Sequence, residues 1–304
     1  MRTRSLALIL LLGCAAERTP AWQAQTAATP PKTSPAKGAA AAVDDPFQKA
    51  VAEGDALFAE RSDRDKLQKA ILAWERATTI KDDWHVWQKM SRAAYFMADG
   101  ILGFETDTEE GKKKQEEVFQ KGIAYGERAM ASYSPEFLQA VKADNKPEDH
   151  VKLINKEGVP AMYWFAVNLG KWATAKGFAT RLANKDKIKK IIDRCNELDP
   201  DYFYAAPPRF LGAYYAIAPA FAGGDLNKAY DFFMKSITKA PGYFATRVLL
   251  AEEWATRRPD KEAYKRELEL VLNTREDVLP EMVPEQRAEK KKAEKALKLM
   301  EDRF

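Results

Sequence analysis

Residues 226–241 read LNKAYDFFMKSITKAP, and their spacing is the strongest indication of how this chain folds. Ala229 is followed by Phe233 four positions later, by Ser236 three positions after that, and by Pro241 after another five. The second helix of a tetratricopeptide hairpin needs this order. Small residues stand where the two helices cross, a large residue lies one turn away, and a proline often follows the helix. The stretch therefore predicts the second helix of such a hairpin.

The same spacing recurs along the chain, so we expect the hairpin to repeat. Three further sets of residues match the second helix of the hairpin. They are Ile188, Ile192, Cys195 and Pro200, then Ala70, Trp74 and Ala77, and more weakly Gly122, Gly126 and Ala129. Three sets of residues partly match the first helix of the hairpin. They are Leu211, Gly212 and Tyr215, then Gly54, Leu57 and Phe58, and Trp87 with Met90. From position 45 onward, apolar residues recur at spacings of three and four, which is typical of helices.

These patterns predict an all-α fold, a divergent tetratricopeptide-like helical-hairpin solenoid that covers residues 47–304. We expect about four helix pairs and a final helix that begins near Pro284, because proline is tolerated in the first turn. The sequence Gly223-Gly224-Asp225 should end one helix and start the next, with Asp225 as its N-cap. Lys290, Lys291, Lys292, Lys295 and Lys298 are expected to form a solvated basic face on the final helix.

Composition limits the classes of function. The 304 residues include 49 Lys and Arg against 45 Asp and Glu, a net charge of +4. Proteins whose main partner is nucleic acid usually have a strong basic excess, so no nucleic-acid partner is expected. Two cysteines and two histidines provide little for a disulfide framework or a zinc site. We expect neither a metal site nor a cofactor.

The N-terminus has the pattern of an export signal. Arg2 and Arg4 precede an apolar run at positions 6–12, which is too short to span a membrane, and Gly13-Cys14 follows it. The run resembles the lipobox of bacterial lipoproteins, in which the cysteine thiol receives a diacylglyceryl group before cleavage. We expect residues 1–13 to be a signal peptide and Cys14 to be the lipid attachment site. In the alternative interpretation, cleavage occurs elsewhere and Cys14 is not modified.

Residues 14–46 are predicted to comprise the lipidated cysteine and a disordered tether. The segment is rich in Ala, Pro and Thr, and Trp22 is its only aromatic residue before Phe47. Such a segment buries too little apolar surface to offset the entropy lost on ordering. Ala15 is not the aspartate that retains enteric lipoproteins in the inner membrane. We therefore expect a periplasmic lipoprotein of the bacterial cell envelope, on the outer membrane.

One predicted helix is apolar on nearly all of its surface. Residues 161–175 read AMYWFAVNLGKWATA, and Asn168, Lys171 and Thr174 form one narrow polar stripe. A helix of this composition lies at the centre of its fold. The stripe could face a wet groove, in which Lys171 pairs with an acid, and Tyr163 and Trp164 could help to line it. Alternatively, the stripe meets solvent or a neighbouring carboxylate and has only a structural role.

A second aromatic region covers residues 202–221. Its tyrosines can bury a ring while the hydroxyl group stays polar, which suits the wall of a mixed cavity, although core packing is the alternative. The candidate groove residues are Tyr163, Trp164, Asn168, Lys171, Tyr214 and Tyr215.

Several motifs are shared with one known family. They are Val159-Pro160-Ala161-Met162-Tyr163-Trp164, Gly223-Gly224-Asp225 followed by Ala229 and Phe233, residues 243–251, and residues 296–304. On these motifs the chain, from about residue 47 to 304, resembles the TatT family, the T components of tripartite ATP-independent periplasmic (TRAP) transporters. Members are lipoproteins of degenerate tetratricopeptide-like helices, thought to work with a periplasmic solute-binding protein, and some form oligomers with pores or clefts. Phe165-Ala166-Val167 departs from the small or polar residues usual in the family.

The sequence does not favour an enzyme. His85 and His150 stand alone, and the nucleophile-elbow, phosphate-loop and His-Glu-x-x-His motifs do not occur. We therefore predict no catalytic residues.

The resemblance implies a periplasmic accessory lipoprotein, the T component of a TRAP-type uptake system. It would dock a solute-binding protein and hold or pass its ligand. Its expected partners are that solute-binding protein, a second copy of itself, and the membrane through the lipid. The alternative is a tetratricopeptide scaffold lipoprotein for envelope assembly that binds no small molecule. The transporter interpretation predicts a continuous cavity lined by the helices that carry Tyr163 and Tyr214, and the scaffold interpretation does not.

Overall fold

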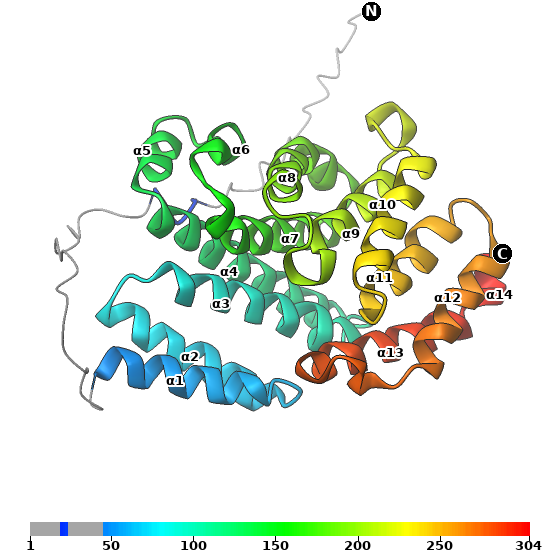
Figure 1. The fold of residues 1–304 in the computed structure, drawn as a ribbon, viewed down its shortest axis with the longest axis horizontal. Coiled ribbons are helices and arrows are strands. Elements are labelled where there is room, and N and C mark those ends of the chain that lie inside the picture. The colour runs from blue at the N-terminus through cyan, green and yellow to red at the C-terminus, as the bar shows by residue number, and fades with distance from the viewer. Residues whose placement is uncertain (1–18, 24–44) are drawn as a thin grey trace, which may run out of the picture.

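The computed structural model describes residues 19–23 and 45–304, and within them every regular element is helical (Figure 1). The α-helices are α1 (Pro46–Ala59), α2 (Arg64–Ile80), α3 (Trp84–Phe96), α4 (Glu109–Tyr133), α5 (Pro135–Asp144), α6 (Pro147–His150), α7 (Val159–Ala175), α8 (Phe178–Leu198), α9 (Tyr202–Ile217), α10 (Leu226–Lys239), α11 (Phe244–Leu249), α12 (Lys261–Asn273), α13 (Val283–Lys298) and α14 (Met300–Arg303). Two π-helical segments are η1 (Met97–Ile101) and η6 (Leu250–Ala255). Short 3-10 turns are η2 (Leu102–Phe104), η3 (Val151–Leu153), η4 (Lys156–Gly158), η5 (Ala220–Ala222), η7 (Glu276–Val278) and η8 (Pro280–Met282). The all-α prediction is confirmed.

Aspartate caps determine where several helices begin. Asp225 accepts hydrogen bonds from the backbone N–H groups of Asn227 at 3.0 Å and Lys228 at 3.1 Å, as predicted for an N-cap. Gly223 has a φ of 90°, a left-handed conformation that glycine adopts at little cost, and it ends the preceding turn. Cap and glycine together therefore determine the start of α10.

Neighbouring helices pack as hairpins (Figure 1). The pairs are α1 with α2, α3 with α4, α7 with α8, α9 with α10, and α11–η6 with α12, and α13 follows them. Five pairs occur where about four were expected, because residues 244–273 form a further hairpin. The short helices α5 and α6 lie between the second and third pairs. The final helix contains Pro284 in its first turn, as predicted.

Small and large residues of the hairpin signature meet where the helices cross. A Cβ atom placed on Gly212 of α9 would lie 2.8 Å from the Phe233 ring of α10. One placed on Gly54 of α1 would lie 2.3 Å from the Trp74 indole of α2. Both rings are buried. The tetratricopeptide-like packing predicted from residue spacing is therefore present in the first and the fourth hairpins.

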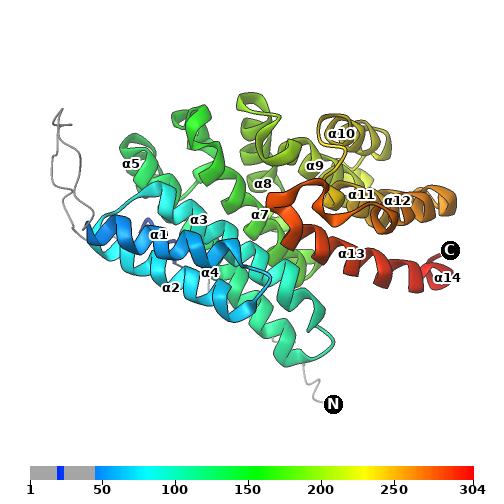
Figure 2. The same ribbon diagram turned by 60° about the horizontal axis from the view of Figure 1, so that its bottom comes forward.

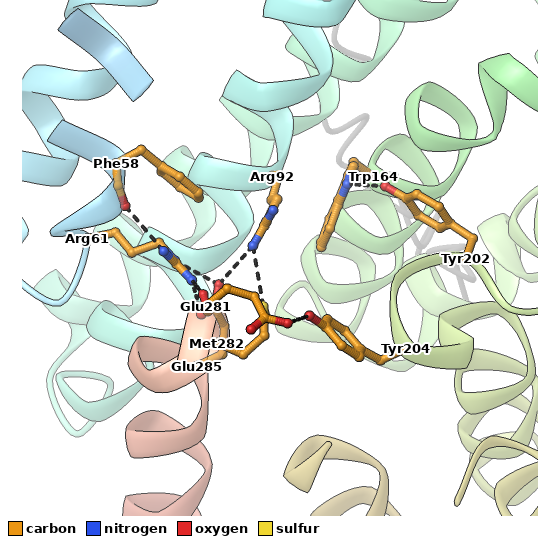
Figure 3. Close-up of polar contacts among 9 residues, drawn as sticks. All are labelled: Phe58, Arg61, Arg92, Trp164, Tyr202, Tyr204, Glu281, Met282 and Glu285. Atoms are coloured by element: carbon orange, nitrogen blue, oxygen red, sulfur yellow. Dashed lines mark hydrogen bonds and ion pairs between the residues drawn. The ribbon is translucent and has the colours of Figure 1, made fainter. Parts of the chain in front are cut away.

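The last long helix returns to the first hairpin (Figure 2). Arg61, in the α1–α2 loop, donates to Glu285 of α13 from Nε at 2.9 Å and from Nη2 at 2.6 Å. Arg92 of α3 donates to the same carboxylate at 3.3 Å (Figure 3). We call Arg61, Arg92 and Glu285 the clasp. It joins segments that are far apart in the sequence and closes the helical array.

Trp22 belongs to the core although it precedes the first helix. Its side chain is 1% exposed. Its ring lies edge-on to Phe137, at 6.3 Å between centroids, and tilted against Phe165 at 6.1 Å. The indole N–H donates to Asn145 Oδ1 at 2.8 Å. This part of the expected tether is therefore docked, because one aromatic ring provides burial that the average composition of the segment does not reveal.

The remaining N-terminal predictions lie outside the described residues. These are the signal peptide at residues 1–13, Cys14 as the lipid attachment site, and most of the tether. Within the described residues, no helix is both long enough and apolar enough to cross a membrane.

Candidate functional site

Helix α7 lies at the centre of the fold, as its composition predicted. Residues 161–169 are all buried, and the helix packs against α3, α4, α8 and α9. Glycine permits the close approach of α4, because a Cβ atom on Gly126 would lie 2.7 Å from Phe165. Cys195 of α8 is also buried, and burial raises the pKa of its thiol.

A cavity of about 500 Å³ lies beside α7. Its walls come from α3 and η1, from α7, α8 and α9, and from α11, η6 and α13. Tyr163 of α7 and Tyr214 of α9 both line it, so the cavity expected between their helices is present. Aromatic and aliphatic side chains form much of the wall, and charged side chains from several helices interrupt it.

Four of the six candidate groove residues line this cavity: Tyr163, Trp164, Lys171 and Tyr214. Tyr215 is not among the lining residues. Its ring stacks on Phe232 instead, at 5.7 Å between centroids and an interplanar angle of 9°. Neighbouring positions on a helix point about 100° apart, so adjacent tyrosines of α9 have different surroundings.

Asn168 also does not line the cavity. It is fully buried, and its amide nitrogen donates to the Ser91 carbonyl at 3.0 Å, the Ser91 hydroxyl at 3.2 Å and the Trp164 carbonyl at 2.8 Å. Because residues three apart on a helix differ by about 60° in direction, the stripe turns away from the cavity between Lys171 and Asn168. Asn168 therefore joins α7 to α3.

Lys171 pairs with a neighbouring carboxylate, which both interpretations of the polar stripe allow. Its Nζ lies 2.6 Å from Asp99 Oδ1, and Lys292 Nζ lies 2.6 Å from Asp99 Oδ2. Burial alone would raise the pKa of Asp99, but the two ammonium groups hold it well below its usual range. Asp99 is therefore ionised at neutral pH.

The expected solvated basic face is wrong for Lys292. This ammonium group bonds to Asp99 and, at 2.7 Å, to Glu289. Burial alone would lower the pKa of Lys292, but the two carboxylates raise it. Lys291, Lys295 and Lys298 are exposed, as expected. The sequence could not separate these lysines, because the partner of Lys292 comes from a distant helix.

Two π-helical segments supply acidic residues to the cavity. Asp99 belongs to η1, and Glu252 and Glu253 belong to η6. Burial raises the pKa of Glu252, and Arg303, at 3.3 Å, opposes that shift. A π-helical turn contains an extra residue and so changes the direction of the side chains in it, and such turns are frequent at functional sites.

A strained backbone turn at residues 203–205 lies beside the same cavity. Phe203, Tyr204 and Ala205 have φ values of 44°, 59° and 54°, in the left-handed region. A non-glycine residue held there costs about 1–3 kcal/mol and persists only where its surroundings hold it. Arg209 supplies part of that hold, donating to the Tyr204 carbonyl at 2.9 Å and the Phe203 carbonyl at 3.4 Å. Burial and a hydrogen bond to Glu281 raise the pKa of Tyr204 to about 12 (Figure 3).

Aromatic rings surround this strained turn. Trp164 lies 5.1 Å from Tyr163 and 4.9 Å from Phe203, and Phe203 lies 5.8 Å from Tyr243, all measured between centroids. The Trp164 N–H donates to the Tyr202 hydroxyl at 2.8 Å (Figure 3). These rings form an apolar wall on which the body of an organic molecule could rest.

Arg209 is the cavity residue that the sequence analysis missed. Its side chain is 5% exposed, and its guanidinium carbon lies 4.4 Å from the centroid of Tyr243. Among the described residues, Arg209 is in no ion pair. Its guanidinium group donates hydrogen bonds to the two backbone carbonyls, and it also interacts with the Tyr163 hydroxyl, which is neutral. The sequence contains one signal, since Arg209 is the only charged residue between Asp201 and Asp225.

The cavity therefore combines a partly open volume, aromatic walls and a buried cation. Within the described residues, no group of three or more His, Cys, Asp or Glu side chains is placed to hold a metal ion. His85 stacks on Trp84 at 3.8 Å, and His150 Nε2 lies 2.9 Å from Asp144 Oδ2, both away from the cavity lining.

Comparison with known proteins gives one finding about the family. The model of the family TAtT, TRAP transporter T-component, matches residues 93–304. The matched region begins within α3 and includes every residue that lines the cavity. No curated protein matches the chain.

Proposed function

This chain belongs to the family of TRAP transporter T-components, and on that premise we propose that it serves a TRAP-type uptake system as a periplasmic accessory protein. It docks the solute-binding protein of the system and holds or passes the ligand. The observation that carries the proposal is the cavity of about 500 Å³, which is within the range usual for small-molecule sites. The chemistry is binding and transfer, without a covalent step.

The proposed ligand is an organic acid with an apolar body. A buried guanidinium group is costly without a negative partner, and Arg209 has none among the described residues. A carboxylate in the cavity would supply that charge, and guanidinium and carboxylate fit each other as hydrogen-bonding partners. The carboxylates of Glu285 and Glu289 also line the cavity, but Arg61 and Lys292 already bind them. The rings of Trp164 and Phe203 would hold the apolar part.

The rim of the cavity suits a protein partner. Phe178 lines the cavity and is 52% exposed, and Phe221, two residues after the lining residue Pro219, is 79% exposed. Exposed aromatic side chains of this kind are common at protein interfaces. We propose that the solute-binding protein covers this rim, so that the ligand passes between the two proteins without entering bulk water.

The membrane attachment is a further part of the proposal. Residues 1–13 are the signal peptide, Cys14 carries the lipid, and the outer membrane is the location. The basic start, the short apolar run and Gly13-Cys14 support this part. A second copy of the chain remains a proposed partner.

Capture of partners from lightly cross-linked host membranes, read by mass spectrometry, tests the proposal. The native protein should recover a periplasmic solute-binding protein together with TRAP membrane subunits. Phe178→Ser and Phe221→Ser should weaken that recovery, whereas Ile80→Ser should not, because Ile80 is equally exposed, at 54%, but does not line the cavity. Recovery of assembly or secretion proteins without a solute-binding protein would instead support the scaffold role.

A further inference from the structure

The docked N-terminal segment makes two polar contacts and one deep apolar contact with the folded body. The Ala21 N–H donates to Glu127 Oε2 at 2.7 Å, and the Trp22 N–H donates to Asn145 Oδ1 at 2.8 Å. The Trp22 ring packs against Phe137 of α5 and Phe165 of α7. We call Ala21 and Trp22 the latch; in Figure 1 the segment lies near α5. A buried ring whose N–H is satisfied stays bound, since undocking exposes both the ring and its site.

The latch and the cavity lie on opposite faces of α7. Tyr163, Val167, Gly170 and Thr174 line the cavity and follow the spacing of a single helix face. Phe165, on which Trp22 packs, is two positions after Tyr163 and therefore lies about half a turn away. Trp22 thus docks on the side of α7 that lies away from the cavity.

The chain between the lipid site and the latch is short. Trp22 follows Cys14 by eight residues, which can span at most about 28 Å when fully extended. Without the latch, the connection from Cys14 to the first helix at Pro46 would have 32 residues and would allow the body to rotate freely.

We propose that the latch orients the protein on its membrane. The side formed by α4 and α5 faces the lipid surface, and the cavity faces away from it, toward the space from which a solute-binding protein approaches. This inference rests on the proposed lipid attachment at Cys14, and it makes the latch a positioning element for the proposed docking.

Energy transfer to labelled lipid tests the orientation. The full-length lipidated protein is placed in liposomes that contain rhodamine-labelled phosphatidylethanolamine. A donor dye is attached through an azidophenylalanine, either at Leu153 or at Phe178, which are exposed to similar extents, 46% and 52%. Leu153 belongs to η3, which packs against α5 on the latch side, and Phe178 lines the cavity.

Transfer should be at least twofold more efficient from position 153 than from position 178. Trp22→Ala should abolish most of that difference, while Gln23→Ala, a change of the exposed neighbour, should preserve it. Equal transfer from the two positions, or a difference that survives Trp22→Ala, would overturn the proposed orientation. Mass spectrometry of the same preparation reports whether Cys14 carries lipid. An unmodified Cys14 would overturn both the lipid attachment and this orientation, whereas partner capture tests docking independently.

Discussion

At the scale of single residues, Asp99 organises the charges of the cavity. It binds Lys171 from α7 and Lys292 from α13 and so links two helices that are distant in the sequence. The folded state holds the pKa of Asp99 below the unfolded value of about 3.9. A lowered pKa contributes stability above the unfolded value, and that contribution is lost as the pH falls below it.

Asp99→Asn should therefore change how the free energy of unfolding depends on pH in acidic solution. The free energy of unfolding of the native protein should fall more steeply between about pH 5 and pH 3 than that of the variant, because only the native protein must protonate Asp99 against two cations. Urea unfolding at a series of pH values measures this difference. Parallel curves for the two proteins would show that Asp99 contributes nothing to acid sensitivity.

Arg209 is predicted to bind the carboxylate of the ligand. Arg209→Met should weaken the binding of 3-phenylpropanoate, a carboxylate with an aromatic body, by roughly tenfold or more, because a hydrogen bond to a charged group contributes about 1.5–3 kcal/mol. Lys171→Met should have a smaller effect, because Asp99 already neutralises Lys171. Titration calorimetry measures both.

The matched control is Arg181→Met, which removes a more exposed guanidinium from the same cavity. 3-Phenylpropanamide serves as the uncharged ligand. If the amide binds as tightly as the acid, or if Arg181→Met has the same effect as Arg209→Met, Arg209 is not an anion site. Circular dichroism separates this result from unfolding, which matters because Arg209 also holds the left-handed turn.

At the scale of elements, the hairpins depend on small residues at the helix crossings. Gly212→Ala would bring a Cβ atom to 2.8 Å from the Phe233 ring and force α9 and α10 apart. Overpacking of this kind typically costs about 1–3 kcal/mol. Thermal and urea unfolding should show that loss.

Gly103→Ala is the control for this crossing, because the nearest atom to its added Cβ lies 3.5 Å away. Its stability should change little. A Gly212→Ala variant as stable as this control would mean that the crossing can relax without loss. Replacing Phe233 by the smaller Leu in the Gly212→Ala variant should recover part of the stability if the clash is the cause.

At the scale of the whole molecule, the clasp joins the two ends of the array. Arg61 and Glu285 are both largely buried, and Arg92 shares the carboxylate. Removing one partner of a buried ion pair costs up to about 3–5 kcal/mol, and the full cost applies where the other charge is left uncompensated. Arg61→Met leaves Arg92 beside Glu285, so it should destabilise the contact between the first hairpin and α13 by less than that full cost, but by more than the loss of an exposed ion pair.

The pair Arg64–Glu105 provides the control for the clasp, because both side chains are 45% exposed. Arg64→Met should cost no more than about 1 kcal/mol, as expected for an exposed ion pair. Urea unfolding compares the two variants, and hydrogen exchange shows whether α1 and α13 lose protection together. Equal effects of the two substitutions would contradict a structural role for the clasp.

The local structure of this protein could be predicted from its residue pattern. The spacing of Ala229, Phe233 and Ser236 predicted a hairpin helix, Asp225 was identified as its cap, and the composition of residues 161–175 predicted the central helix. These features could be predicted because they depend on residues a few positions apart, for which helix geometry fixes the direction of each side chain. The pairing of Lys171 with an acid was also anticipated, but the acid could not be named.

Which side chains share the cavity depends on how the helices pack in three dimensions. That packing separated Asn168 and Tyr215 from Tyr163 and Tyr214, paired Lys292 with Asp99 and brought Arg209 to the aromatic wall. The docking of Trp22 and the contact made by the clasp could not be predicted from the sequence either. The physical reason is common to all of them: burial and charge pairing depend on partners contributed by distant segments, and a pattern along the sequence contains no information about which segments meet.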